Sequence, residues 1–210
     1  MNRTRIKFCG MTSADDVRRA VEAGADAVGF IFAHSPRRLR FEQIGRMIEA
    51  APPYVTRVAV LTEHEERFVP ELLGLGFTLQ FSGDEEAESC ERLSGGLPYV
   101  KAFHVKPGGA LPPERELEAY RHALRMFDTF AEGRGGGAGV PFGWEIVAEA
   151  ARARPIVVAG GLTPHNVAAC VRSVRPYAVD VRSGVERDGK KDLESMRAFV
   201  RAVREADAEA

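Results

Sequence analysis

The feature that most constrains the fold is a repeated alternation of short apolar runs with stretches of helical periodicity. The apolar runs are rich in β-branched residues and begin roughly 20–30 residues apart, as strands joined by crossover helices do. They are nearly continuous in hydrophobicity, which is typical of parallel strands covered on both faces. The expected strands are Arg5–Cys9, Ala27–Ile31, Arg57–Thr62, Thr78–Phe81, Tyr99–His104, Leu124–Phe130, Pro155–Ala159 and Ala178–Val181. The expected helices are Ser13–Ala23, Phe41–Ala50, Glu65–Leu75, Glu85–Leu93, Trp144–Ala151, His165–Arg172 and Leu193–Glu205.

Eight such repeats predict an α/β fold in which eight parallel strands close one (β/α)8 TIM barrel. The chain has 210 residues, within the range of a single barrel, so we expect one domain over residues 1–210. A doubly wound sheet is the alternative. The prolines and glycines of residues 107–113 leave room for only a short fifth helix, which is expected to be short or missing. A second irregular stretch, residues 132–141, is glycine-rich and predicts a functional loop.

Charge and cysteine content exclude several classes of protein. The 29 Lys+Arg and 30 Asp+Glu give a net charge of −1, so there is no general attraction to nucleic acid or to an anionic membrane. The longest apolar run, 27–33, is far shorter than the ~18 residues that cross a bilayer. Three widely spaced cysteines, Cys9, Cys90 and Cys170, argue against a disulfide framework or a zinc site. We therefore expect a cytoplasmic protein without nucleic-acid or membrane partners.

Two late strands each end in a glycine-containing loop that leads toward a helix. The first loop contains Gly160 and Gly161, and the second contains Ser183 and Gly184. Glycines permit positive φ and close backbone approach, so that N–H groups can converge on a phosphate. Barrel enzymes often bind phosphate in the loops after strands seven and eight, which is where these loops fall. Either loop alone could be a simple tight turn, but the two together predict a phosphate site.

Cofactor motifs are excluded by their context. Residues 184–191 approximate a P-loop, but Lys191 stands where a Ser or Thr should hold Mg²⁺. The glycine-rich residues 133–139 lack the early strand–turn–helix setting of a dinucleotide fingerprint. The five histidines show no metal-ligand spacing. We expect neither a cofactor nor a metal.

Three further residues are candidates for chemistry, each with an alternative interpretation. Cys9 ends the first strand, where barrel side chains point into the active mouth, although a lone cysteine is more often a packing residue. Asp128 lies inside an apolar run, where a carboxylate is costly to bury without a function. Arg37 belongs to a basic cluster after the second strand that could be solvated surface or could hold a substrate carboxylate.

These residues and their order resemble the phosphoribosylanthranilate isomerase family of tryptophan biosynthesis, over nearly the whole chain. Residues 7–12, Lys-Phe-Cys-Gly-Met-Thr, are similar to the family's opening K-I-C-G-x-T motif. The second-strand residues 29–32 with Ser35-Pro36-Arg37 also resemble the family, as do Gln80 and Gly83-Asp84-Glu85. The set is completed by the loop ending in Phe142 and Trp144, by residues 159–164, and by residues 180–186.

The resemblance implies an intramolecular oxidoreductase without cofactor or metal. It would convert N-(5-phosphoribosyl)anthranilate to 1-(2-carboxyphenylamino)-1-deoxyribulose 5-phosphate by an Amadori rearrangement. Cys9 would be the general base that removes the sugar C2 proton, and Asp128 the general acid that protonates the ribose ring oxygen. Arg37 would grip the anthranilate carboxylate. The N–H groups of Gly160, Gly161, Ser183 and Gly184 would hold the phosphate. The expected partner is a small phosphosugar, and the protein would be a monomer or a homodimer.

The chain departs from the family's pattern at several positions. The departures are Ser82 in place of a histidine, Ala138, Val140 and Gly143 in the glycine-rich block, and Arg182 in place of a small residue. Cys9 must have its thiolate favoured by nearby dipoles or cations, and Asp128 must stay protonated through burial. Two alternative functions are a related barrel that acts on another phosphosugar and a non-catalytic barrel that binds a phosphorylated ligand.

Overall fold

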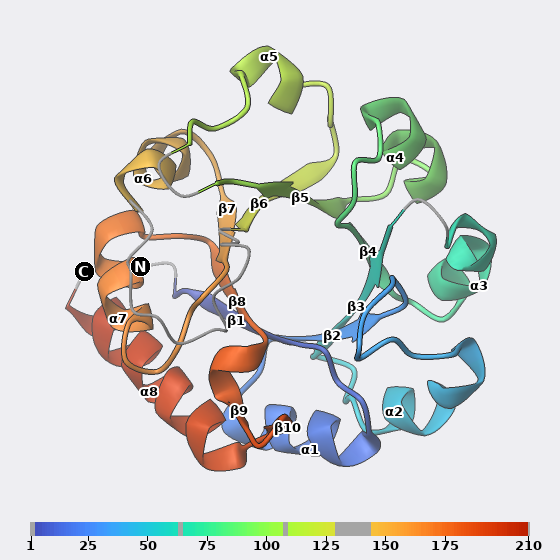
Figure 1. The fold of residues 1–210 in the computed structure, drawn as a ribbon, viewed down its shortest axis with the longest axis horizontal. Helices are drawn as coiled ribbons and strands as arrows, with labels where there is room; N and C mark the ends of the chain where they lie inside the picture. The colour runs from blue at the N-terminus through green and yellow to red at the C-terminus, as the bar shows by residue number, and fades with distance from the viewer. Residues whose placement is uncertain (1–2, 63–64, 107–108, 129–143, 210) are drawn as a thin grey trace.

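A computed structural model describes residues 3–62, 65–106, 109–128 and 144–209, and within them parallel strands close a barrel in the order β1 to β8 (Figure 1). Each strand pairs with the next along the chain, and β8 pairs with β1 to close the ring. The strands are β1 (Arg5–Cys9), β2 (Ala27–Ile31), β3 (Thr56–Leu61), β4 (Thr78–Phe81), β5 (Tyr99–His104), β6 (Ala123–Asp128), β7 (Ile156–Ala159) and β8 (Ala178–Val181). The expected (β/α)8 barrel is confirmed, and the doubly wound alternative is wrong.

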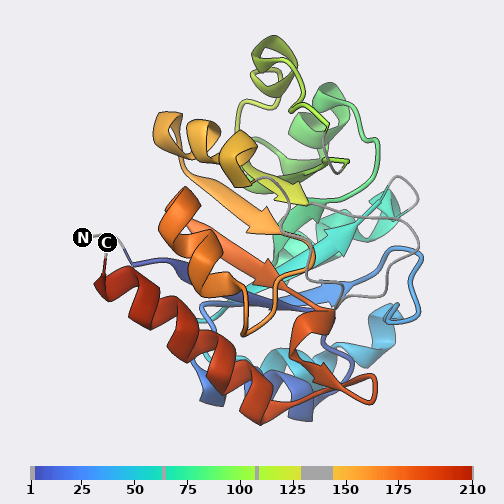
Figure 2. The same cartoon turned by 60° about the vertical axis from the view of Figure 1, so that its left-hand side comes forward.

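Helices surround the ring of strands and cover its outer face (Figures 1 and 2). They are α1 (Ala14–Ala23), α2 (Gly45–Glu49), α3 (Val69–Gly74), α4 (Ala87–Ser94), α5 (Glu114–Leu117), α6 (Trp144–Ala153), α7 (Val167–Val174) and α8 (Leu193–Ala208). The last helix lies against the start of the first strand, where Asp207 accepts hydrogen bonds from the N–H and the hydroxyl of Thr4 at 2.9 and 2.6 Å. In the described part of the chain no helix is long and apolar enough to cross a bilayer.

Local sequence explains where the helices begin. Ser13 caps α1 as expected, because its Oγ accepts the N–H of Asp16 at 3.1 Å. The expected helix 65–75 is instead a 3-10 turn, Glu66–Phe68, followed by α3, since Pro70 is tolerated only in the first turn of a helix. The expected helix 41–50 is likewise a 3-10 turn, Phe41–Gln43, followed by α2. The short fifth helix is confirmed as α5.

One hairpin was not expected. The two-residue strands β9 (Glu186–Arg187) and β10 (Lys190–Lys191) pair antiparallel after β8. Asp188 and Gly189 join them with φ of 52° and 73°, as a two-residue turn with two positive φ angles requires. The expected last residues of the sixth strand, 129 and 130, and the glycine-rich stretch 132–141 lie outside the described residues.

Alternate residues of each strand face opposite sides, and this periodicity sets what lines the barrel. Ile6 and Phe8 belong to the core between strands and helices, so Lys7 and Cys9 face the interior. The barrel interior on the side of β5 and β6 is apolar and includes Val100, Ala102 and Met126. The carboxyl ends of all the strands therefore present their last inward side chains at one mouth of the barrel.

Candidate active site

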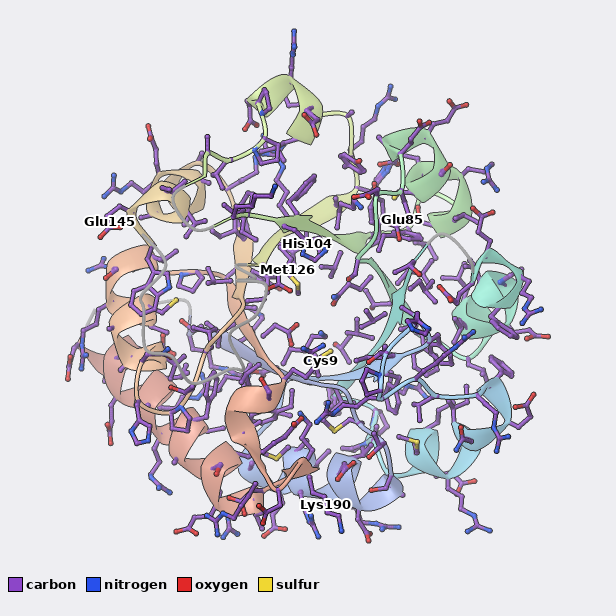
Figure 3. The ribbon with its side chains drawn as sticks, in the orientation of Figure 1. Cys9, Glu85, His104, Met126, Glu145 and Lys190 are labelled. Atoms are coloured by element: carbon purple, nitrogen blue, oxygen red, sulfur yellow. The ribbon has the colours of Figure 1, made fainter. Side chains whose placement is uncertain are left out.

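Cys9 is the last residue of β1, and its thiol is buried at the mouth of the barrel with 6% of the residue exposed. Figure 3 shows Cys9, His104 and Met126 lying toward the inside of the ring of strands. The neighbouring strand leaves room for the thiol because Gly29 has no side chain. A Cβ at this glycine would lie 2.7 Å from Sγ of Cys9 and 3.1 Å from Cε of Lys7. The absence of a side chain at Gly29 is therefore a requirement of the site.

Lys7 connects Cys9 to a buried carboxylate. Its Nζ donates to Oδ2 of Asp180 at 2.9 Å, across the paired strands β1 and β8. Lys7 also forms a hydrogen bond with Cys9. Burial acts to lower the pKa of Lys7, but the charges of Asp180 and Cys9 outweigh it and raise the pKa. The ammonium group is therefore charged at neutral pH, directly beside the candidate base.

The pKa of Cys9 is set by two opposing effects. Burial raises the pKa of the thiol, and the charge and hydrogen bond of Lys7 oppose this rise, helped by the more distant Lys191. The cations that the sequence analysis required are present, but burial outweighs them and the pKa of the thiol stays above its ordinary value. The resting group is the thiol, held next to an ammonium that stabilises the thiolate whenever it forms.

Asp128 is the last residue of β6 and is partly buried at the same mouth. Burial raises the pKa of its carboxyl group, which agrees with the expectation that the acid is kept protonated. His104 opposes this most strongly, since it is the strand partner of Asp128 on β5. Asp180 raises the pKa further, whereas Arg182 and Lys7 lower it.

Cys9 and Asp128 share the same electrostatic surroundings. Lys7 and Asp180 act on the pKa of both groups, although β1 and β6 are separated around the ring by β7 and β8. Charges act strongly only over short distances in a protein interior. The thiol and the carboxyl group therefore lie at one mouth, both near the Lys7–Asp180 pair.

Arg37 lies on the loop after β2 and reaches the loop after β8. Its guanidinium forms an ion pair with Glu186, which also accepts from Nζ of Lys191 at 2.8 Å. The stem of Arg37 passes over Gly10, where an added Cβ would lie 2.9 Å from Cδ of the arginine. The structure therefore places the candidate carboxylate-binding residue beside Cys9, with its charge balanced by Glu186.

The loops after β7 and β8 pack against each other. Gly160 and Gly161 have φ of +89° and +62°, a region that L side chains rarely adopt. An added Cβ at Gly184 would overlap the carbonyl oxygen of Leu162 from the other loop. The side chain of Asn166 fixes the first loop, because its Nδ2 donates to the carbonyl of Gly161 at 3.0 Å. The four residues expected to bind phosphate are thus brought to one place.

Several residues of the mouth were not assigned a role from the sequence. They are Lys7, Gly29, His104, Asp180 and Glu186. Strand periodicity could have found Lys7, which is two residues before Cys9 and so shares its face. Residues Ala138, Val140 and Gly143 lie outside the described residues. Among the described residues, no group of three or more His, Cys, Asp and Glu is arranged to hold a metal ion.

Comparison with known proteins gives one consistent match. The family model described as N-(5'phosphoribosyl)anthranilate (PRA) isomerase matches residues 6–202. A relative from Pseudomonas fluorescens (strain Pf0-1), named N-(5'-phosphoribosyl)anthranilate isomerase, is 43% identical over 209 residues that cover 97% of this chain and 100% of the relative.

Solved structures agree with the sequence match. Phosphoribosyl anthranilate isomerase from Thermotoga maritima has a TM-score of 0.83 and 33% identity, and the match covers 96% of this chain and 99% of that one. A phosphoribosyl anthranilate isomerase in complex with reduced 1-(o-carboxyphenylamino)-1-deoxyribulose 5-phosphate has a TM-score of 0.79 and 32% identity, with the same coverage. Both are similar to this chain over the whole barrel.

Proposed function

This chain belongs to the N-(5'-phosphoribosyl)anthranilate isomerase family, and we propose that Cys9 and Asp128 are the base and the acid of its reaction. The protein is an isomerase of tryptophan biosynthesis that converts N-(5-phosphoribosyl)anthranilate to 1-(2-carboxyphenylamino)-1-deoxyribulose 5-phosphate. A small-molecule phosphosugar is its substrate. Three further expectations stay predictions: a single domain over residues 1–210, a monomeric or homodimeric state, and a cytoplasmic location.

The first step opens the ribose ring. Asp128 gives its carboxyl proton to the ring oxygen, the bond from C1 to that oxygen breaks, and the anthranilate nitrogen forms a double bond to C1. Asp128 suits this role because burial raises the pKa of its carboxyl group. The step leaves a carboxylate, which His104, Arg182 and Lys7 stabilise as it forms, because all three lower the pKa of Asp128.

The second step moves a proton from carbon to sulfur. Cys9 first passes its thiol proton to the carboxylate left on Asp128, and the resulting thiolate takes the proton from C2. The electrons of the C2–H bond form a double bond to C1, which gives an enolamine and neutralises the imine. Lys7 is a positioning residue here, because its ammonium hydrogen-bonds the sulfur and opposes the rise in the pKa of the thiol. The enol then becomes the ketone as its hydroxyl loses a proton and C1 gains one. Cys9 is then again the thiol and Asp128 again the carboxylic acid, which is the starting pair.

Binding groups at two ends of the mouth would orient the substrate between acid and base. Arg37 would bind the anthranilate carboxylate by exchanging its partner Glu186 for the ligand. The N–H groups of Gly160, Gly161, Ser183 and Gly184 would bind the phosphate, since the two loops that carry them pack together. Orientation of this kind supplies much of the rate in enzymes that use neither metal nor cofactor.

The observation that carries this proposal is the placement of a thiol and a carboxyl group around one shared ion pair, Lys7–Asp180. It disfavours a non-catalytic barrel, which has no need to bury an ionisable pair at the mouth. A barrel that acts on another phosphosugar would use the same pair, so the substrate must be tested directly.

The test follows the loss of anthranilate fluorescence when the purified protein is added to N-(5-phosphoribosyl)anthranilate. We expect turnover by the natural chain and a loss of ~10²–10⁴-fold in kcat for Cys9→Ser, the usual effect of removing a positioned base. Cys90→Ser is the matched control, because Cys90 is buried away from the mouth beside the carbonyl of Glu85, which can accept a hydroxyl. Equal losses in both variants, or none in Cys9→Ser, would exclude Cys9 as the base.

A further inference from the structure

We propose that Arg182 is a further substrate-binding residue, whose guanidinium binds the phosphate together with the N–H groups of the loops after β7 and β8. This inference rests on the proposed function, because it uses the phosphate site assigned there. Arg182 stands directly before Ser183, at the start of the 3-10 turn Ser183–Val185.

Two observations place the side chain over the mouth. An added Cβ at Gly10 would lie 3.4 Å from Cγ of Arg182, so the stem of the arginine runs over the residue that follows Cys9. Arg182 also acts on the carboxyl group of Asp128 at the end of β6. The side chain therefore extends from the loop after β8 over Gly10, at the mouth of the barrel.

A buried lysine holds the backbone of Arg182 in place. Nζ of the buried Lys191 donates to the carbonyl oxygen of Arg182 at 2.7 Å. Lys191 is fixed in turn by Glu186, which accepts from it at 2.8 Å. The hairpin of β9 and β10 supplies both residues, so it anchors the start of the loop and limits where the arginine can point.

The charges nearby favour an anionic ligand for Arg182. Arg37 and Lys191 share the carboxylate of Glu186, whereas the ion pairs among the described residues do not include Arg182. The side chain is exposed, so its guanidinium is accessible to a ligand. A guanidinium binds a phosphate through two parallel hydrogen bonds, which is stronger and more specific than a single ammonium contact.

Arg182 is adjacent in the chain to Ser183 and Gly184, so it is placed for the phosphate. The stems of Arg182 and Arg37 both lie beside Gly10, and the guanidinium of Arg37 is held by Glu186 in the hairpin after β8. Arg182 is therefore the arginine beside Gly10 whose charge is not balanced by an ion pair among the described residues.

The test compares Arg182→Ser, Arg182→Lys and the control Arg187→Ser at constant ionic strength. Arg187 is an exposed arginine of the same hairpin that pairs with Asp192 and Glu194, so its loss changes the net charge equally. Inhibition by inorganic phosphate and by anthranilate is measured for each protein. For Arg182→Ser we expect KM and the inhibition constant of phosphate to rise at least about tenfold, the usual effect of losing a charge-assisted hydrogen bond. For Arg182→Lys, KM and the inhibition constant of phosphate should lie between those of the natural chain and of Arg182→Ser. For Arg187→Ser, both constants should match the natural chain.

The outcomes separate this inference from the function it rests on. If the natural chain turns over the substrate and Arg182→Ser leaves the inhibition constant of phosphate unchanged, Arg182 does not bind phosphate. A rise for anthranilate alone, or a lower KM in Arg182→Ser, also overturns the proposal. If the natural chain does not turn over the substrate, the proposed function itself fails. A thermal melt of each variant checks that it is folded, and Arg182→Lys, which keeps the long stem, tests binding independently of any loss of packing.

Discussion

Gly29→Ala tests how tightly the site is built around Cys9. Gly29 lies on β2, directly beside Cys9 in the strand register. An alanine Cβ there would lie 2.7 Å from Sγ of Cys9 and 3.1 Å from Cε of Lys7, whereas ordinary contacts begin at 3.4 Å. The thiol must therefore move by about 0.7 Å, and the ammonium stem must move with it.

The size of this displacement predicts a kinetic loss. A misplacement of about 1 Å costs on the order of 10²-fold in rate, because the reacting atoms leave their near-attack geometry. We therefore expect kcat of Gly29→Ala to fall by roughly 10²-fold, with KM within a few-fold, since Arg37 and the phosphate loops are not displaced. Overpacking should also lower the free energy of unfolding by about 1–3 kcal/mol.

The assay is the loss of anthranilate fluorescence, with urea unfolding of each variant in parallel. Gly45→Ala is the control, because nothing lies within 4 Å of a Cβ added there and its φ is not positive. It should match the natural chain in kcat and KM, and its free energy of unfolding should be equal or up to about 1 kcal/mol higher, because alanine restricts the unfolded chain more than glycine does. A Gly29→Ala variant with kcat within threefold of the natural chain would refute the reasoning, since the base would then tolerate a displacement that the structure requires.

Two further predictions concern Asp128. Its pKa is raised by burial, so its contribution to stability is fully present only below the ordinary pKa of a carboxyl group and is lost as the pH rises through the folded value. Asp128→Asn should therefore raise the Tm at pH 7, and the gain should shrink as the pH is lowered toward 4; an equal or lower Tm at pH 7 would contradict this. The groups that act on Asp128 are His104, Asp180, Arg182 and Lys7, of which His104 lowers its pKa most. His104→Gln should raise the pKa of Asp128 in a ¹³C NMR titration of the carboxyl group. An unchanged pKa would show that the imidazole does not stabilise the Asp128 carboxylate.

The alternation of apolar runs and helical periodicity was enough to predict the barrel, because each parallel strand must be buried on both faces. The elements that differed contain local conflicts with helical structure. Pro70 restricts where α3 can begin, and a 3-10 turn takes up the preceding residues. The hairpin of β9 and β10 was missed because residues 184–191 were compared with a P-loop, although Asp188-Gly189 is a hairpin signal.

The candidate acid, base and phosphate loops were predicted from strand ends and glycines, but their partners were not. Lys7 and Asp180 lie 173 positions apart in the sequence and meet only because β8 closes the barrel against β1. Arg37 and Glu186 are 149 positions apart and meet through a hairpin that the sequence analysis did not include. The pKa of Cys9 also depends on burial in the folded barrel. Burial raises this pKa by more than the nearby cations lower it.

The most direct test of the account is kcat/KM for Cys9→Ser, Asp128→Asn and the double variant on N-(5-phosphoribosyl)anthranilate. Groups that act as a unit are not additive. We predict that each single variant loses ~10²–10⁴-fold and that the double variant is little worse than the more impaired single variant. A single variant with nearly natural activity, or losses that simply multiply in the double variant, would contradict the claim that this thiol and this carboxyl group work on one bound sugar.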